Sequence, residues 1–340
     1  ELYKIEEYIK IIAKRAFQLH LFRSTILHDQ NSALIIDHID HDIEKISPIL
    51  LKLGTLREPQ IPIEKYIHFI ETKDKQLLPL VLELIETTFS SHAKKFVLPL
   101  IDPDTKPDKI AIGIFKDKFL TKDEMLLFWI NSSHLWKKTI ALNYCIKNEK
   151  AKLLTQATWK TKKNIQTEYN LLNSQEIAYI NRNFLNNEIS IEENNKMYSI
   201  LEKTLLLKTV NLFQKIPGNV LSKIAQIATE ISLETDDVIF QEGEPGKSLF
   251  VIITGKVNIL NDNQIIANLE KGNCIGEMSI LDQAPRSADA IAAEESILLQ
   301  IDQDGFFELM AGNPDIMKEI IKMLTKRLRK MNKKLTDSLK

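Results

Sequence analysis

One stretch near the C-terminal end, residues 276–290, constrains the chain more than any other. It reads GEMSILDQAPRSADA and places a carboxylate, Glu277, nine positions before a guanidinium, Arg286. The residues between them predict a Gly-led turn into a short apolar helix, followed by a loop fixed by Pro285. A helix start offers unpaired backbone N–H groups, and a guanidinium offers planar donors that fit phosphate oxygens. Since a carboxylate accepts hydrogen bonds from hydroxyls, the pattern predicts a site for a small anion with a phosphate and a sugar hydroxyl.

These residues resemble the phosphate-binding cassette of the cyclic-nucleotide-binding domain family, which includes protein kinase A regulatory subunits and bacterial catabolite-activator-type regulators. The family pattern is Gly-Glu-aliphatic-small-Leu, a short spacer, and then Pro-Arg-small-Ala. The chain carries both halves at the family's spacing, as Gly276, Glu277, Met278, Ser279 and Ile280, then Pro285, Arg286, Ser287 and Ala288. The resemblance identifies a candidate ligand site and implies that its ligand is a cyclic mononucleotide.

The resemblance also implies a role for each part of this site. Arg286, Ser287 and the backbone N–H groups of residues 278–280 would hold the cyclic phosphate. Glu277 would hold the ribose 2′-OH. The apolar wall around the base would be formed by Ile275, Ala288 and a residue of the last helix, Ile320 or Met323.

Three points about the ligand stay open. Family members that prefer cyclic GMP often carry Thr at the position of Ser287, but bacterial cyclic AMP receptors carry Ser there. Cyclic AMP is favoured because it is the commoner bacterial ligand.

Asp289 adds a negative charge three residues from Arg286, and it either pairs with Arg286 or points to solvent, as strand alternation allows. In an alternative interpretation, Glu277 and Arg286 pair with each other in a roll that no longer binds a ligand.

The residues before the cassette predict a small antiparallel barrel or roll. β-Branched and aromatic runs at 238–240, 249–253 and 257–260 are separated by turn residues, namely Gly243, Pro245, Gly246 and Gly255. Helices are expected at residues 216–229 and 305–334, before and after the strands. The family resemblance covers roughly residues 204–334, and we assign residues 204–340 to the ligand domain.

The first two hundred residues predict an all-α region instead. Apolar residues recur there at helical spacing, and breaks fall at residues 54–62, 102–107 and 131–134. The stripes are Ile5, Ile9, Ile12 and Ala16; Ile39, Ile43, Ile46, Leu50 and Leu53; Leu78, Val81, Leu82 and Ile85; and Phe128, Leu135, Ile140 and Tyr144. Paired helices with a repeat of about 40 residues indicate HEAT-like repeats at residues 1–150, with a generic helical bundle as the alternative. The polar stretch 151–203 predicts a helical connector. The fold class is therefore α+β and multidomain.

Residues 77–101 and 134–143 look like HEAT-type helices. Residues 83–102 also resemble the linker helices of bacterial membrane proteins in which a nucleotide-antiporter-like major-facilitator domain precedes HEAT-like helices and a cyclic-nucleotide domain. This resemblance rests mostly on hydrophobic positions. It implies that the chain is the cytoplasmic C-terminal region of a transporter, and that Glu1 is a cut point within a longer protein.

Bulk properties are those of an ordinary globular protein. The formal net charge of −1 gives no overall attraction to nucleic acid or membrane, and no apolar run approaches the length of about 20 residues that spans a bilayer. Cys145 and Cys274 suggest no disulfide framework, which fits a cytoplasmic location, or the cytoplasmic face of the inner membrane if the chain is part of a larger protein.

The remaining motifs predict no chemistry. No phosphate loop, kinase signature, nucleophile elbow or zinc-protease motif occurs, so neither an enzyme nor a cofactor is expected. DNA binding is not expected either. A catabolite-activator-type transcription factor would need a helix-turn-helix after the last helix, and the sequence stops soon after that helix. His38 and His41 in residues 37–42 are spaced for one helix face, but they are more readily explained as part of a solvated face than as metal ligands. The basic face of the last helix, residues 318–334, suits either solvent or an anionic membrane or acidic partner.

Overall fold

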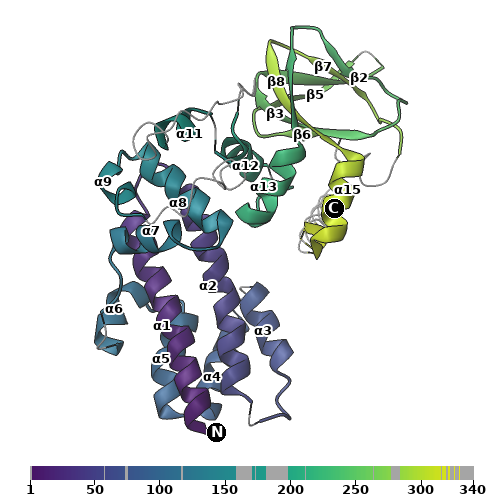
Figure 1. Ribbon diagram of the computed structural model, residues 1–340. Helices are drawn as coiled ribbons and strands as arrows, with labels where there is room; N and C mark the ends of the chain where they lie inside the picture. Colours follow the sequence, from purple (N-terminus) through teal and green to yellow (C-terminus); the bar gives the residue numbers. More distant parts are fainter. Residues whose placement is uncertain are drawn as a thin grey trace. The chain divides into compact units, whose positions relative to one another are not determined.

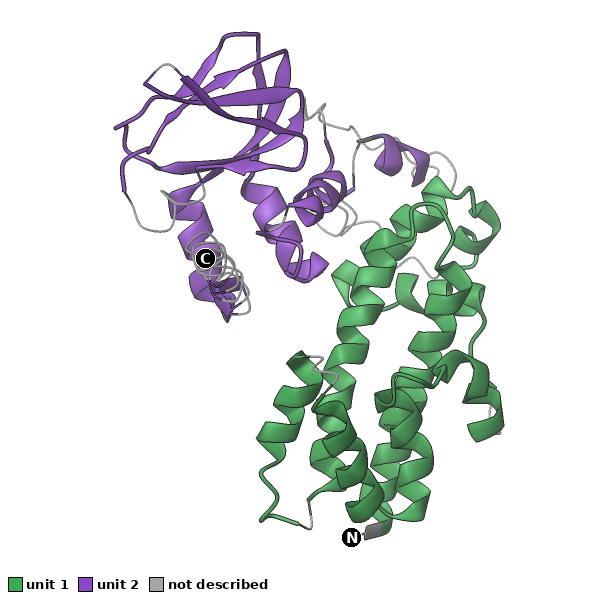
Figure 2. Cartoon of the chain, turned by 180° about the vertical axis from the view of Figure 1, so that it is seen from behind, with its two compact units in different colours: residues 1–161 green, residues 162–340 purple. Residues whose placement is uncertain are grey.

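The computed structural model describes residues 2–56, 58–72, 76–115, 118–157, 171–172, 174–180, 198–210, 212–262, 264–276, 284–314, 316–318, 321, 325 and 329. The chain divides into two compact units, residues 1–161 and 162–340 (Figure 2). The predicted connector, residues 151–203, spans this division, and much of it lies outside the described residues.

The first unit is helical (Figure 1). Its described helices are α1 (Leu2–Ile26), α2 (Ala33–Gly54), α3 (Ile63–Thr72), α4 (Leu78–Thr88), α5 (Ser91–Ile101), α6 (Pro107–Ile114), α7 (Lys122–Ile130), α8 (Leu135–Lys147) and α9 (Ala151–Leu154). The predicted breaks coincide with the ends of α2, α5 and α7, where Gly, Pro or Asn interrupts the helical pattern. Local signals also fix the starts: Thr121 and Glu124 form a capping box at the beginning of α7.

The long helix α1 lies at the centre of this unit. It packs against α2, α5, α6 and α7, which are not all its neighbours in sequence. Aromatic side chains fill the contact: the ring centroids of Phe17 and Phe115 are 5.4 Å apart, and those of Phe22 and Trp129 are also 5.4 Å apart. In a solenoid each repeat contacts only its neighbours. The packing shows a helix-rich unit, and the HEAT-like assignment stays a prediction.

One predicted apolar stripe was wrong in part. Phe128 is 62% exposed and Leu135 is 39% exposed, whereas Ile140 and Tyr144 are buried as expected. The buried face of α7 is formed by Met125, Leu126, Trp129 and Ile130. Phe128 therefore lies on the opposite side of a helix that is apolar on both sides, and periodicity alone did not show which side is buried.

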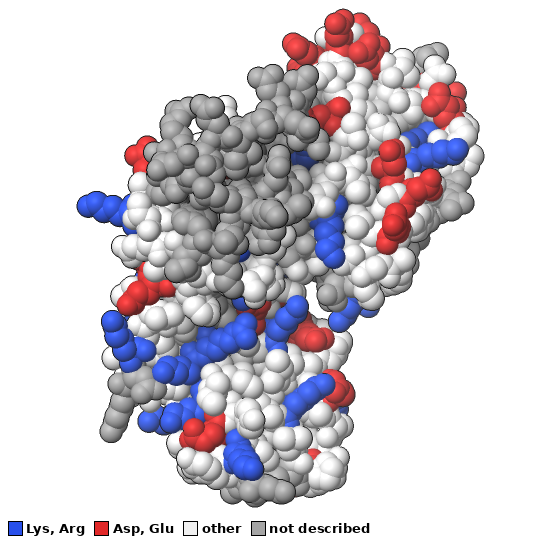
Figure 3. Space-filling view, viewed as in Figure 1, with Lys and Arg blue, Asp and Glu red and all other residues white. Residues whose placement is uncertain are grey.

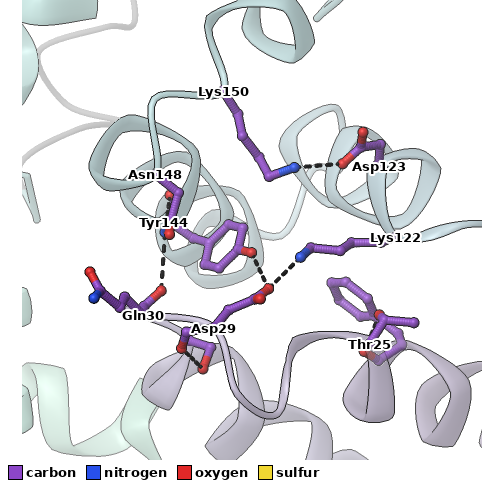
Figure 4. A network of polar contacts seen from close by, with 10 residues as sticks. Thr25, Asp29, Gln30, Lys122, Asp123, Tyr144, Asn148 and Lys150 are labelled. Atoms are coloured by element: carbon purple, nitrogen blue, oxygen red, sulfur yellow. Dashed lines mark hydrogen bonds and ion pairs between the residues drawn. The ribbon is translucent and has the colours of Figure 1, made fainter.

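A polar network joins the α1–α2 turn to α7 and α8 (Figure 4). The Oδ2 atom of Asp29 accepts hydrogen bonds from the Lys122 ammonium and from the Tyr144 hydroxyl, the latter at 2.5 Å. Asn148 Nδ2 donates to the backbone oxygen of Gln30 at 3.1 Å. Burial and the hydrogen bond to Asp29 raise the pKa of Tyr144. Burial also acts to raise the pKa of Asp29, but the hydrogen bonds from Lys122 and Tyr144 outweigh it, and the pKa is lowered. The network holds the turn against both helices.

The second unit contains two antiparallel sheets, which together form a β-roll. The strands are β1 (Thr229–Leu233), β2 (Val238–Phe240), β3 (Ser248–Thr254), β4 (Lys256–Asn261), β5 (Gln264–Glu270), β6 (Cys274–Ile275), β7 (Asp289–Ala292) and β8 (Ser296–Asp302). One sheet has the order β1-β8-β3-β6, and the other has the order β2-β7-β4-β5. The predicted runs at 238–240, 249–253 and 257–260 correspond to β2, β3 and β4.

Strand β3 shows how the layers pack. Its residues Phe250 and Ile252 face the second sheet, while Leu249, Val251 and Ile253 face a cluster of helical side chains. Both sides of the strand are therefore buried, which explains its continuous apolar run. The described helices of this unit are α11 (Ser174–Ile180), α12 (Ile200–Thr209), α13 (Gly218–Ile227) and α15 (Gln303–Gly312). Helices α12, α13 and α15 contribute to the helical side of this core.

The predicted helix ends near the roll need adjustment. The helix expected at 216–229 ends at Ile227, because residues from Thr229 onward form β1 and pair with β8. Helix α15 ends at Gly312, two residues before Pro314, whose ring disfavours helical geometry at the preceding residue. Most of the remaining predicted helix, up to residue 334, lies outside the described residues, as do Ile320 and Met323.

Charges of both signs are spread over the face drawn in Figure 3. Lys and Arg side chains are scattered over the lower part, and Asp and Glu side chains gather at the upper end. In the part of the chain that the structure describes, no helix is both long enough and apolar enough to cross a bilayer. Cys145 and Cys274 are reduced thiols, and burial raises the pKa of Cys145 to about 12.

Candidate functional site

The structure places the two ends of the predicted cassette on different sheets. Gly276 directly follows β6, which pairs with β3, and Arg286 lies shortly before β7, which pairs with β2 and β4. The residues between them, 277–283, lie outside the described residues. The predicted ligand residues Glu277, Met278, Ser279 and Ile280 are among these. The described part of the site therefore consists of Ile275, Gly276, Pro285, Arg286, Ser287 and Ala288.

The turn between β2 and β3 holds the end of the cassette through its main chain. The backbone N of Gly243 donates to the backbone oxygen of Arg286 at 2.9 Å, and the backbone N of Arg286 donates to that of Glu244 at 2.8 Å. Pro245 and Pro285 form an isolated antiparallel bridge beside them. Gly243 has a φ of 82°, a conformation that suits glycine. The turn that Gly243, Pro245 and Gly246 predicted in the sequence thus holds the backbone of Arg286 in place.

The guanidinium of Arg286 lies inside the protein, although arginine is seldom buried without partners. The residue is only 5% exposed. Its Nη2 atom donates to the backbone oxygen of Ser248 at 2.7 Å, and Nη1 makes a longer contact of 3.4 Å with the backbone oxygen of Gly276. The guanidinium carbon lies 4.1 Å from the centroid of the Phe240 ring and 5.9 Å from that of Phe250.

The Nε atom of Arg286 is different from the terminal nitrogens. It is buried, and among the residues that the structure describes it has no hydrogen-bond partner. Burial lowers the pKa of this guanidinium from its usual value, and the carboxylate of Glu244 opposes that change. A buried donor without a partner costs about 1–3 kcal/mol, so an anionic acceptor placed at this edge would relieve the cost.

Gly276 is required by its contacts as well as by its conformation. Its φ is 77°, and a Cβ atom at this position would lie 2.2 Å from Arg286 Nη1 and 3.1 Å from the backbone oxygen of Ser248. Any larger residue would therefore displace the guanidinium. Gly276 and Arg286, which the sequence motif joined as parts of one site, are in direct contact.

The other described site residues divide into a buried and an exposed set. Ile275 is 3% exposed and packs in the roll core, and Ala288 is 7% exposed. Ser287 is exposed. Asp289, which the sequence left open, accepts a hydrogen bond from the backbone N of Glu242 at 2.7 Å. Its carboxylate therefore supports the β2–β3 turn.

Sequence reasoning missed the residues that surround Arg286. Phe240, Ser248 and Phe250 come from β2 and β3, and none belongs to the cassette. The Ser248 hydroxyl donates to Asp302 Oδ1 at 2.7 Å and accepts from Gln300 Nε2 at 3.1 Å. The only signal in the sequence was the placement of two aromatic residues in the strands before the cassette.

An apolar cavity of about 290 Å³ lies between strands of the two sheets. It is lined by Ile231, Leu233, Val238, Ile239, Phe250, Leu298 and Gln300. Phe250 also lies near the Arg286 guanidinium, with 5.9 Å between the guanidinium carbon and the ring centroid. The predicted base-wall residues Ile275 and Ala288 do not line this cavity.

His38, which the sequence pattern assigned to a solvated face, is instead buried in the helical core, whereas His41 is only partly buried. His38 is 5% exposed, and its ring packs edge to face on Trp129 at 5.5 Å between centroids. Its Nε2 atom lies 3.8 Å from Asp42 Oδ2, and Lys137 Nζ lies 2.9 Å from the same oxygen. Burial lowers the pKa of His38 to about 4. Among the described residues, no group of three or more His, Cys, Asp and Glu side chains could hold a metal ion.

The arrangement around Arg286 suits binding of an oxyanion. A positive charge is held in a site of low polarity, where it interacts more strongly with an anion than it would in water. Two N–H groups hold the guanidinium in place, and a third, at Nε, has no acceptor among the residues that the structure describes. A phosphate oxygen fits this donor set.

Residues 230–313 match the family model described as "Cyclic nucleotide-binding domain". The match covers the strands of the roll, the cassette and α15. This part of the chain is therefore a cyclic nucleotide-binding domain of the type found in catabolite activators and protein kinase A, as the motif indicated.

Two curated relatives illustrate the range of proteins that share this domain. The chain is 27% identical over 137 residues to a CRP-like cAMP-activated global transcriptional regulator of Mycobacterium tuberculosis, covering 39% of this chain and 61% of the regulator. It is 29% identical over 119 residues to cGMP-dependent protein kinase 2 of Homo sapiens, covering 33% of this chain and 16% of the kinase. The chain thus spans less than two thirds of either relative.

A solved structure is also similar to part of the chain. The catabolite activator protein of Thermus thermophilus is 26% identical to the matched part, with a TM-score of 0.34, covering 37% of this chain and 62% of that protein.

Proposed function

We propose that residues 204–340 bind a cyclic mononucleotide and act as a regulatory sensor. The observation that carries this proposal is the buried Arg286 guanidinium, held by two backbone oxygens and an aromatic ring with its Nε donor unpartnered among the described residues. The family match at residues 230–313 supports the same ligand class.

The proposed contacts follow the cassette. Arg286, Ser287 and backbone N–H groups of residues 278–280 bind the cyclic phosphate, and Glu277 binds the ribose 2′-OH. Ile275 and Ala288, with Ile320 or Met323 of the last helix, would form the apolar wall around the base. A charge-assisted contact contributes about 1.5–3 kcal/mol, so losing the Arg286 side chain weakens binding about tenfold to a hundredfold.

Cyclic AMP is the proposed ligand in preference to cyclic GMP. This preference rests on the commonness of cyclic AMP in bacteria, since Ser287 is compatible with both nucleotides. The relatives do not distinguish the two nucleotides either, because one is named for activation by cAMP and another for dependence on cGMP. Direct comparison of the two nucleotides is therefore part of the test.

Binding regulates only if the ligand prefers one conformation over another. We propose that the bound phosphate orders the cassette and shifts the last helix, and that the chain itself catalyses no reaction. We further propose that the chain is the cytoplasmic C-terminal part of a nucleotide-antiporter-like transporter with HEAT-like helices before the roll. The resemblance of residues 83–102 supports this setting. Hydrophobic spans encoded upstream of Glu1 would support it, and a gene without them would contradict it.

The test is calorimetric titration of the folded chain with cyclic AMP and cyclic GMP, with Arg286→Ala as the control. Micromolar or tighter binding that the substitution weakens at least tenfold supports the proposal. Glu277→Ala is then titrated with the ligand and its 2′-deoxy analogue. The cost of this substitution should vanish with the analogue, because the hydroxyl that Glu277 holds is already missing. A full cost with both ligands would refute the role of Glu277.

The second candidate function is a scaffold whose roll binds no nucleotide. The observation that favours it is that protein carbonyls already accept hydrogen bonds from both terminal nitrogens of Arg286. The guanidinium could then be a structural element of the roll, and the helical surface would bind partners. Titrations without heat for both nucleotides, on a chain with an intact circular dichroism spectrum, would favour this candidate.

A further inference from the structure

The Phe240 ring is the closest aromatic partner of the Arg286 guanidinium. The guanidinium carbon lies 4.1 Å from the ring centroid, well within the distance of about 6 Å at which a cation–π interaction is effective. Both residues are buried, with Phe240 8% and Arg286 5% exposed. Screening by water is therefore weak, and the attraction is at the stronger end of its range.

An aromatic ring supports a guanidinium without using its donors. The N–H groups lie in the plane of the guanidinium, whereas the ring attracts the charge from its face. A carboxylate in the same place would instead accept two of the N–H bonds and neutralise the charge. Phe240 thus uses none of the N–H donors of Arg286, and the Nε donor has no hydrogen-bond partner among the described residues.

The strand pairing brings this ring to the cassette. Strand β2 pairs with β7, so that Phe240 lies opposite Ala290, and the register shifts between Val238 and Phe240. The backbone of Arg286 is held by the turn that directly follows β2. The ring and the backbone of Arg286 are therefore held by β2 and by the turn that directly follows it.

We propose that Phe240 is a positioning residue for Arg286, and that its aromatic face sets the affinity of the site for the phosphate of the ligand. This inference rests on the proposed function. It assigns to a strand residue outside the cassette the task of holding the guanidinium in the orientation that binds. An orientation fixed before binding reduces the ordering cost of association.

Packing alone would give Phe240 a different role. The residue also belongs to the apolar cluster inside the roll, with Phe250, Ile252 and Leu298. If it only fills space, then Leu, which is apolar, should replace it at a cost in stability but with no specific cost in ligand affinity. If it positions Arg286, an aromatic replacement should rescue affinity and an aliphatic one should not.

The experiment compares three variants of the whole chain. Phe240→Leu removes the ring, Phe240→Tyr keeps it, and Phe213→Leu makes the same change at a buried residue in another apolar cluster. Calorimetric titration with cyclic AMP and cyclic GMP should show affinity about 5- to 30-fold weaker for Phe240→Leu. Phe240→Tyr should stay within about twofold of the wild type, and Phe213→Leu should bind normally.

A second measurement does not depend on the nucleotide. A guanidinium over a ring face experiences a ring current, so the Arg286 Nε–H proton should resonate upfield of an ordinary arginine. The resonance is assigned by its loss in Arg286→Lys. It should keep its position in Phe240→Tyr and move to the ordinary range in Phe240→Leu.

The outcomes separate the two proposals. Wild-type binding with equal affinities for Phe240→Leu and Phe240→Tyr would overturn the positioning role and leave the proposed function intact. An Nε–H resonance that is the same in both variants would also overturn it. A folded wild type that binds neither nucleotide would overturn the proposed function itself.

Discussion

Lys203 Nζ lies 3.0 Å from Glu230 Oε1, and this ion pair joins α12 to the first strand of the roll. The two side chains are 3% and 15% exposed, so the pair is largely removed from water. Lys203 Nζ also donates to the backbone oxygen of Ala228 at 2.9 Å. Separating such a pair leaves a buried charge, which is far more costly than losing an exposed pair.

Lys203→Met should therefore lower the free energy of unfolding by about 3 kcal/mol or more. The double substitution Lys203→Met with Glu230→Gln should recover part of this loss, since no unpaired charge remains. Urea unfolding measures both. Lys52→Met is the control, because Lys52 and Glu64 form an ion pair of 2.8 Å with side chains 53% and 75% exposed, and its loss should cost less than about 1 kcal/mol. Equal costs for Lys203→Met and Lys52→Met would contradict the importance of burial.

The two glycines around Arg286 offer a matched comparison. Gly276 has a φ of 77° and Gly243 a φ of 82°, so Ala at either position adopts a left-handed conformation at a cost of about 1 kcal/mol. A Cβ on Gly276 meets Arg286 Nη1 at 2.2 Å, whereas no described atom lies within 4 Å of a Cβ on Gly243. Gly276→Ala should thus lose more stability than Gly243→Ala, and about tenfold or more in nucleotide affinity. Urea unfolding and calorimetry test this. Equal losses of stability and affinity in both variants would argue against a close contact between position 276 and the guanidinium.

Tyr144 should contribute to the stability of the helical unit through its hydroxyl. Its hydrogen bond to the Asp29 carboxylate is 2.5 Å long, and the residue is 1% exposed. Tyr144→Phe should lower the free energy of unfolding by about 1–2 kcal/mol, because the bond involves a charged acceptor. Tyr8→Phe, at a tyrosine that is 60% exposed, is the matched control and should have little effect. Similar values for the two variants in urea unfolding would show that the network around Asp29 is not stabilising.

The helical unit should lose stability in mild acid because of His38. Burial lowers its pKa from 6.5 to about 4, and nearby Lys137 acts in the same direction while Asp42 opposes it. The unfolded chain therefore binds a proton at a higher pH than the folded chain. The free energy of unfolding should fall as the pH decreases from about 6.5 to about 4, by at most about 3 kcal/mol for this residue.

Urea unfolding at several pH values, in His38→Phe, tests this expectation. The pH dependence in that window should become weaker, but not vanish, since burial also lowers the pKa of His20 and of His41. His28→Gln, at an exposed position, should keep the wild-type dependence. A His38→Phe variant with the full pH dependence would assign the effect to other groups.

Local patterns predicted much of the fold. The apolar run at 249–253 indicated β3, and Gly54, Pro107 and Asn131 marked helix boundaries because each disfavours continued helix. Strand β1 was not predicted: the expected helix ran to Thr229, and residues 229–233 form a strand through their pairing with β8. The exposed Phe128 was misplaced for a similar reason, since tertiary packing selects between two apolar faces of α7.

The candidate site shows the same limit. The spacing of Gly276 and Arg286 predicted that they share a site, because the cassette is a local motif. The contacts of Arg286 with Phe240 and Ser248 depend on residues 46 and 38 positions away, which meet only after the two sheets have formed. A local sequence pattern therefore cannot predict these contacts.

The turn that holds the cassette makes its bonds to Arg286 entirely with main-chain atoms: the N–H of Gly243 and the oxygen of Glu244. Such a support depends on backbone shape, so most side chains of the turn can change without moving the guanidinium. Glu242 and Glu244 are exposed there. Substitution of these two carboxylates would therefore change the charge near Arg286, and with it the rate at which an anion arrives. The backbone geometry that holds Arg286 would stay the same.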